Sequence, residues 1–168
     1  MFCSGFRKII KSSFYPKKFS FEFFGNARKY KYTYILGLGG NIGGDEMVLR
    51  RFHALLAKMK KDRRIKLISS SVVLKNKAFG YENQGDFLNA ILKIKSSVYA
   101  QKMLGITQHY EKIFGRKRSF KDAPRTLDID IIDFSAKIRQ SERLRLPHIA
   151  AHERLSVILP LALMGEKI

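Results

Sequence analysis

Residues 127–134 combine an apolar, β-prone run with two acidic side chains, Asp128 and Asp130. Alternate side chains of a strand share one face, so the two carboxylates project to the same side, with Cα atoms ~6–7 Å apart. The leucine and isoleucines around them favour burial of the strand, and buried carboxylates without a counter-charge are very costly. We therefore expect a positive group beside the pair. The alternative is an edge strand from which both aspartates face water.

A basic, turn-rich stretch precedes this strand. Residues 112–125 contain Arg116, Lys117, Arg118, Lys121 and Arg125, and Pro124 stands just before the strand. Two carboxylates beside guanidinium groups are typical of a phosphoryl-transfer site, in which the acids bind a divalent cation and the arginines bind phosphate. A second interpretation is that the basic residues form a solvated loop and neutralise the aspartates directly.

Charge favours a polyanionic partner. The 168 residues include 33 Lys and Arg against 14 Asp and Glu, for a formal net charge of +19. Such an excess favours a nucleotide, a nucleic acid or an acidic membrane surface. The length indicates a single domain, residues 33–168, preceded by a basic extension, residues 1–32, that we expect to be poorly ordered. An organelle-targeting role for the acid-poor extension is the alternative.

The cysteine content and the absence of long apolar runs bear on location. Cys3 is the sole cysteine, so no intramolecular disulfide can form and a reducing compartment is expected. No apolar run reaches the length of a bilayer span or a secretory signal. We expect a cytoplasmic protein with no membrane association.

The hydrophobic patterns predict the element order β-α-β-β-α-β. Strands are expected at residues 33–38, 65–74, 87–94 and 127–134, and helices at 45–61 and 99–114. Asp45 is the expected N-cap of the first helix. The apolar stripe expected on the first helix is Val48, Phe52, Leu55, Leu56 and Met59, and that on the second is Met103, Ile106, Tyr110 and Ile113. This order is typical of a ferredoxin-like α+β fold, with an antiparallel sheet, helices on one face and a C-terminal extension from residue 135. The other sheet face would be free for a ligand.

The glycine-rich turn at residues 37–44 is not a nucleotide-binding P-loop. Asp45 and Glu46 stand where that motif needs Lys and Ser or Thr, and Ile42 breaks the spacing of a dinucleotide fingerprint. The glycines are expected to allow a tight turn and close approach of the backbone to a ligand.

Several segments together resemble the hydroxymethyldihydropterin pyrophosphokinase family. They are ILGLGGNIG at 35–43, QGDFLNA at 84–90, GRKR at 115–118, PRTLDIDI at 124–131, and LPH, HER and LPL between residues 146 and 161. They occur in the family's order, and PRTLDIDI is the most specific of them.

The resemblance implies an enzyme of folate biosynthesis that transfers the pyrophosphoryl group of ATP to the hydroxymethyl group of a reduced pterin and releases AMP. It implies two Mg²⁺ ions on Asp128 and Asp130, which with Arg116 and Arg125 form the catalytic set. The ATP-binding residues that it implies are Arg116, Arg118, Arg125, His148 and Arg154. Those implied for the pterin are Phe87, Asn89, Asn76 and Phe79, with Phe87 stacking on the ring. A monomer that binds no nucleic acid is expected.

Three departures from the family pattern concern the pterin side. Ser156 replaces a second aromatic, Asp122 and Ala123 replace Trp-Gly, and Asn76 and Lys77 replace Thr-Pro. Two other functions stay open at this point, a ferredoxin-like RNA-binding module and a small-molecule regulatory module. The first needs aromatic residues arrayed on the central strands. The second has no need for the arginine cluster.

Overall fold

The computed structural model describes residues 6–10, 30–78, 80–81, 83–117, 120, 122–135, 137–149 and 151–165. Their elements, in chain order, are β1 (Phe6–Ile10), β2 (Tyr32–Gly40), α1 (Gly44–Lys61), β3 (Ile65–Ser70), β4 (Val73–Asn76), β5 (Phe87–Ser96), α2 (Ala100–Ile113), β6 (Asp128–Phe134), β7 (Arg139–Ser141), β8 (Leu144–Leu146) and α3 (Leu155–Met164).

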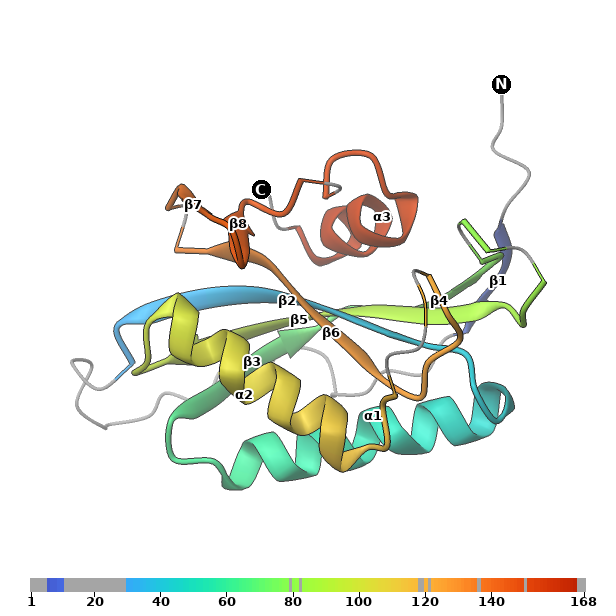
Figure 1. The fold of residues 1–168 in the computed structure, drawn as a ribbon, viewed down its shortest axis with the longest axis horizontal. Coiled ribbons are helices and arrows are strands. Elements are labelled where there is room, and N and C mark those ends of the chain that lie inside the picture. The colour runs from blue at the N-terminus through green and yellow to red at the C-terminus, as the bar shows by residue number, and fades with distance from the viewer. Residues whose placement is uncertain are drawn as a thin grey trace.

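The strands build an antiparallel sheet in the order β1-β4-β5-β2-β6, and β3 pairs with β5 beside β4. Helices α1 and α2 lie along one face of this sheet, whereas α3 and the β7–β8 hairpin lie over the other face (Figure 1). The fold is therefore mixed α and β with an antiparallel sheet.

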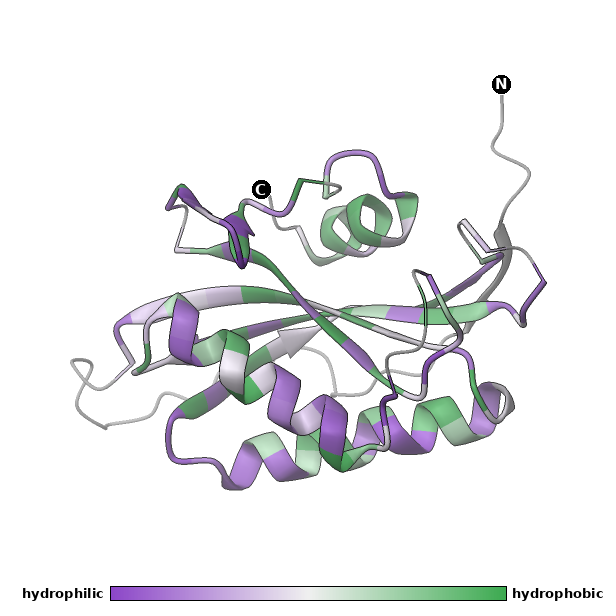
Figure 2. Ribbon diagram, viewed as in Figure 1, coloured by the Kyte–Doolittle hydropathy of each residue, from purple (hydrophilic) through white to green (hydrophobic). Residues whose placement is uncertain are grey.

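The main core lies between the sheet and the helices α1 and α2. The predicted stripe of α1 is buried at all five positions. Along α2 the prediction was wrong at Ile113, which is 46% exposed, because the helix turns Glu111 inward instead. Hydrophilic and hydrophobic residues alternate along α1 and α2, as Figure 2 shows.

Helix α3, which lies in the expected C-terminal extension, begins at Leu155. Its residues Val157 and Leu161, with Ala151, pack against Ile35, Ile91 and Ile132 on the second face of the sheet. This apolar contact corrects the expectation that the whole of that face is free. The part of the same face that carries Asp128 lies beyond this second cluster.

Two local boundaries differ from those predicted. The expected strand 65–74 is divided into β3 and β4 at Ser71, whose hydroxyl accepts a hydrogen bond from the Ile91 N–H at 2.8 Å and so replaces a backbone partner. The N-cap of α1 is Gly43, with φ of 92°, and not Asp45. Asp45 lies in the first turn and forms an ion pair with Lys75 of β4 at 2.8 Å.

Within the expected extension 1–32, Phe6–Ile10 forms β1 and pairs with β4, and Tyr32 already belongs to β2.

Candidate active site

The register of the sheet brings polar residues of three strands to one face. Gly39 of β2 lies opposite Asn89 of β5 on one side and opposite Asp128 of β6 on the other, and Gly37 lies opposite Asp130. Directly opposed residues project from the same face. A Cβ atom on Gly39 would lie 3.3 Å from Asn89 Oδ1 and 3.6 Å from the Cβ atom of Asp128. Glycine at this position therefore keeps the space between Asn89 and Asp128 open.

Asp128 is paired with two arginines. Its side chain is buried, with the residue 9% exposed, and Arg125 Nη1 donates to Oδ2 at 2.6 Å while Arg116 donates to Oδ1. Burial alone would raise the pKa of the Asp128 carboxyl, but the two guanidinium groups hold that pKa below its usual range. The prediction of a positive group beside this carboxylate is confirmed, and the alternative of a water-facing Asp128 is wrong.

Asp130 has the opposite electrostatic character. Burial, together with the charge of Asp128, raises the pKa of the Asp130 carboxyl, and the neighbouring His148 and Arg154 partly offset that rise. The backbone N–H of His148 donates to the backbone oxygen of Ile132 at 2.9 Å, and this bond holds the segment after β8 against β6. Two neighbouring carboxylates with pKa values shifted in opposite directions are a common property of functional sites.

Glu111 of α2 is a site residue that the sequence analysis missed. It is 4% exposed, accepts a hydrogen bond from the Ile129 N–H at 2.9 Å and pairs with Arg116. Burial raises the pKa of its carboxyl, and the bonds from Ile129 and Arg116 oppose the rise. Thr107 is also buried and lies one helical turn earlier. An acid one turn from a small polar residue, beside an apolar stripe, was the signal in the sequence.

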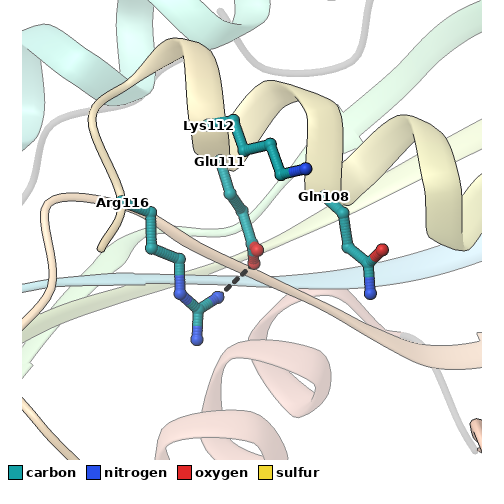
Figure 3. Close-up of a pocket in the computed structure, with 4 residues that line it drawn as sticks. All are labelled: Gln108, Glu111, Lys112 and Arg116. Atoms are coloured by element: carbon teal, nitrogen blue, oxygen red, sulfur yellow. Dashed lines mark hydrogen bonds and ion pairs between the residues drawn. The ribbon is translucent and has the colours of Figure 1, made fainter. Parts of the chain in front are cut away.

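Glu111 and Arg116 also line a cavity of about 470 Å³ together with Gln108 and Lys112. Three of the four side chains come from the last turns of α2, and Arg116 from the loop that follows, with its guanidinium directed at Glu111 (Figure 3). The cavity therefore has a mixed polar lining with two cationic groups, and one of them, Arg116, pairs with the Asp128 carboxylate.

Three loops meet around Asn41. Its side chain accepts from the Arg125 N–H at 2.9 Å and donates to Gln84 Oε1 at 2.9 Å, while Gln84 Nε2 donates to Asp122 O at 2.9 Å. A Cβ atom on Gly80 would lie 2.8 Å from Asp122 Oδ2, so glycine permits this close approach. Asn41 and Gln84 were noted only as parts of motifs, but their bonds fix the glycine turn and the backbone at Arg125.

The residues implied for the pterin lie at the adjacent end of β4 and β5. Asn89 Nδ2 donates to Asn76 Oδ1 at 2.6 Å, and the Arg125 guanidinium carbon lies 5.4 Å from the centre of the Phe87 ring. Arg125 thus contacts both Phe87 and Asp128. Arg118 and Phe79 lie outside the described residues.

Comparison with known proteins identifies the family. The model of the 7,8-dihydro-6-hydroxymethylpterin-pyrophosphokinase (HPPK) family matches residues 35–166. The chain belongs to the HPPK family. The resemblance inferred from the motifs is thereby confirmed, and an RNA-binding module has no support.

Curated relatives carry the name 2-amino-4-hydroxy-6-hydroxymethyldihydropteridine pyrophosphokinase. The protein of Campylobacter jejuni is 42% identical over 160 residues, which are 95% of this chain and 97% of that protein. The protein of Helicobacter pylori is 38% identical over 159 residues, 94% of this chain and 93% of its own length. The protein of Aquifex aeolicus is 37% identical over 129 residues, 77% of this chain and 78% of its own length.

The residues present fit the Mg²⁺ that is expected for an HPPK. Within the described ranges, no group of three or more His, Cys, Asp or Glu side chains is arranged to hold a metal ion. Mg²⁺ does not need such a group, because one or two carboxylates, water and substrate phosphates complete its coordination. Asp128 and Asp130 on one face, with the open space at Gly39, fit this requirement. No helix in the described part of the chain is long and apolar enough to cross a membrane.

Proposed function

We propose that this protein transfers the pyrophosphoryl group of ATP to the hydroxymethyl group of 6-hydroxymethyl-7,8-dihydropterin, giving AMP and the pterin diphosphate in folate biosynthesis. Its family membership supports this reaction. One observation carries the assignment of residues. Asp128 binds Arg116 and Arg125 on the sheet face that also carries Asn89, so phosphate-binding and pterin-binding groups adjoin each other.

Asp128 and Asp130 would hold two Mg²⁺ ions, which when bound neutralise the triphosphate and favour departure of AMP. The surroundings of the two carboxylates shift their pKa values in opposite directions. Asp128 stays ionised because of its two arginines, whereas Asp130 retains a proton more readily because it is buried beside Asp128.

Arg116 and Arg125 would exchange partners during ATP binding. Both arginines pair with Asp128. If Asp128 and Asp130 held cations, both guanidinium groups could donate to phosphate oxygens, for which their planar forks are well suited. The exchange conserves local charge, because the triphosphate supplies the negative charge that the arginines lose. Glu111 keeps a second contact to Arg116 and so limits its movement.

The pterin would stack on Phe87 and hydrogen-bond to Asn89 and Asn76. An aromatic ring provides such a platform at low conformational cost. Arg125 lies over the Phe87 ring, so its movement toward phosphate would also uncover the stacking face. The hydroxymethyl oxygen would then attack the β-phosphorus in line with the bond to the α-phosphate oxygen, and that oxygen leaves with AMP.

Further parts of the proposal rest on the resemblance and on position. Arg118, His148 and Arg154 would contact ATP, and Phe79 the pterin. The catalytic unit would be residues 33–168, in a cytoplasmic monomer that binds no nucleic acid. The strand order β6-β2-β5-β3, with α1 and α2 on one face, supports a ferredoxin-like topology for this unit.

The direct test is incubation with ATP, Mg²⁺ and the reduced pterin, followed by chromatography. We expect stoichiometric AMP and pterin diphosphate. Formation of ADP, or AMP that appears equally without pterin, would contradict the proposed reaction. Omission of Mg²⁺ in the presence of EDTA should abolish product formation.

A further inference from the structure

The N-terminal strand β1 lies outside the matched family region yet pairs with a strand of the candidate site. The family model begins at residue 35, whereas β1 covers Phe6–Ile10. The Campylobacter and Helicobacter matches cover 95% and 94% of this chain and therefore extend well into the residues before Tyr30. These two relatives therefore share part of the N-terminal segment with this chain.

The pairing of β1 reaches the end of the sheet that carries the pterin residues. Phe6 lies opposite Asn76 of β4, and Asn76 in turn lies opposite Phe87 of β5. In a parallel row, Ile9 lies opposite Leu74, which lies opposite Asn89. These two rows contain Asn76, Phe87 and Asn89, which are the three described residues proposed for the pterin.

Strand β4 needs such a neighbour. It has four residues, and without β1 its outer edge would have unpaired backbone groups. Short edge strands are prone to local opening, since few backbone hydrogen bonds hold them. The Asn76 side chain accepts from Asn89 at 2.6 Å, so opening of β4 would also release Asn89.

We infer that β1 is a positioning element for the pterin half of the site, because it clamps β4 and thereby holds Asn76 and Asn89 in place. The inference rests on the proposed function for the identity of the ligand. It deepens that function by assigning to residues 6–10 a role in pterin affinity that ATP affinity does not share.

The test uses the full chain with Lys8→Pro and Ile9→Pro combined. Successive residues of an antiparallel strand point their N–H groups to opposite sides, so two adjacent prolines remove at least one donor directed at β4. The matched control combines Ser12→Pro and Ser13→Pro, which place the same substitution in the extension beyond β1.

Two measurements decide the matter. Hydrogen exchange should show faster exchange of the amides of residues 73–76 in the β1 variant and unchanged exchange in the control. Calorimetry with the reduced pterin, Mg²⁺ and a non-hydrolysable ATP analogue should show pterin affinity about fivefold weaker, as loss of roughly one net hydrogen bond implies. Affinity for the ATP analogue should stay within about twofold, a margin smaller than one net hydrogen bond would produce.

Unchanged exchange at β4 would refute the clamp. Faster exchange with unchanged pterin affinity would refute its role in the site, and an equal loss of ATP affinity would indicate general loosening instead. Absence of AMP formation by the wild-type protein would refute the proposed function separately. Hydrogen exchange at β4 and pterin affinity would still show whether β1 has the positioning role.

Discussion

The two halves of the candidate site are held together by different forces. On the phosphate side, Asp128, Arg116 and Glu111 form a buried chain of ion pairs anchored to β6 and α2. On the pterin side, neutral amides and rings predominate, and the loops contact through the exposed pair Tyr81 and Phe120, which are 41% and 56% exposed with ring centres 5.3 Å apart. The phosphate side is thus fixed by buried ion pairs, while the pterin side depends on contacts that a few substitutions can alter.

The largest expected effect tests the charged half. Asp128→Asn keeps the shape of the side chain but removes the charge that binds a cation, and AMP formation should fall by about a thousandfold or more. Asp130→Asn should do the same, whereas Asp133→Asn on the same strand should retain activity. Initial rates of AMP release, with circular dichroism to verify folding, provide the measurement. Near-normal turnover of Asp128→Asn or Asp130→Asn would contradict the proposal that this pair binds Mg²⁺.

Glu111→Gln should produce an effect of about tenfold, since it removes the negative charge that strengthens the hydrogen bond from Arg116. The Ile129 N–H and Arg116 both donate to Glu111 Oε1, and the amide oxygen can accept from both, so the change isolates the charge of the carboxylate. We expect kcat/KM for ATP to fall while the KM for the pterin is unchanged. Glu46→Gln on the exposed side of α1 is the control. A change in the KM for the pterin alone would contradict the assignment of Glu111 to the phosphate half.

Phe87→Ala should weaken pterin binding by about tenfold through loss of ring stacking and buried area. Phe87→Tyr retains a ring and should restore most of the affinity. Binding of the ATP analogue, measured by calorimetry, is expected to be little affected. If the affinities for the pterin and for the ATP analogue decrease together, the contact between Phe87 and Arg125 couples the two halves of the site.

Acid should weaken the phosphate half first. Because burial and Asp128 raise the pKa of the Asp130 carboxyl, this group takes up a proton at a higher pH than an ordinary aspartate. Affinity for the Mg²⁺ complex of an ATP analogue is therefore expected to decrease severalfold as the pH falls toward that raised pKa. Asp128 stays ionised throughout this range, since its pKa is lowered. Constant affinity down to the normal aspartate range would argue against Asp130 as a ligand.

The smallest expected effect concerns the loop contact. Phe120→Ala removes an exposed edge-to-face pair with Tyr81, and pterin affinity should decrease by about threefold. Phe120→Tyr should preserve it. Pterin titrations at saturating ATP analogue are sensitive enough for this difference, and an unchanged value would leave Gln84 as the main connection between these loops.

The local patterns of the sequence predicted most of the fold and the centre of the site. The buried stripe of α1 and the shared face of Asp128 and Asp130 follow from periodicities of a few residues. What escaped prediction depends on partners distant in the chain. The buried Glu111 carboxylate accepts from the Ile129 N–H, 18 positions later, and β1 forms against β4, whose residues lie more than 60 positions later. A short-range pattern can indicate a buried acid, as at Glu111, but it does not identify the distant partner.

The guanidinium group of Arg125 contacts both the Phe87 ring and the Asp128 carboxylate. A substitution there would disturb both substrates at once, so natural or selected variation in pterin preference is expected to avoid it. Such variation should accumulate instead at Asn76, Tyr81 and Phe120, which lie apart from the ion pairs. The same geometry leads us to expect that resistance to an inhibitor is hardest to acquire at the border between the two proposed subsites.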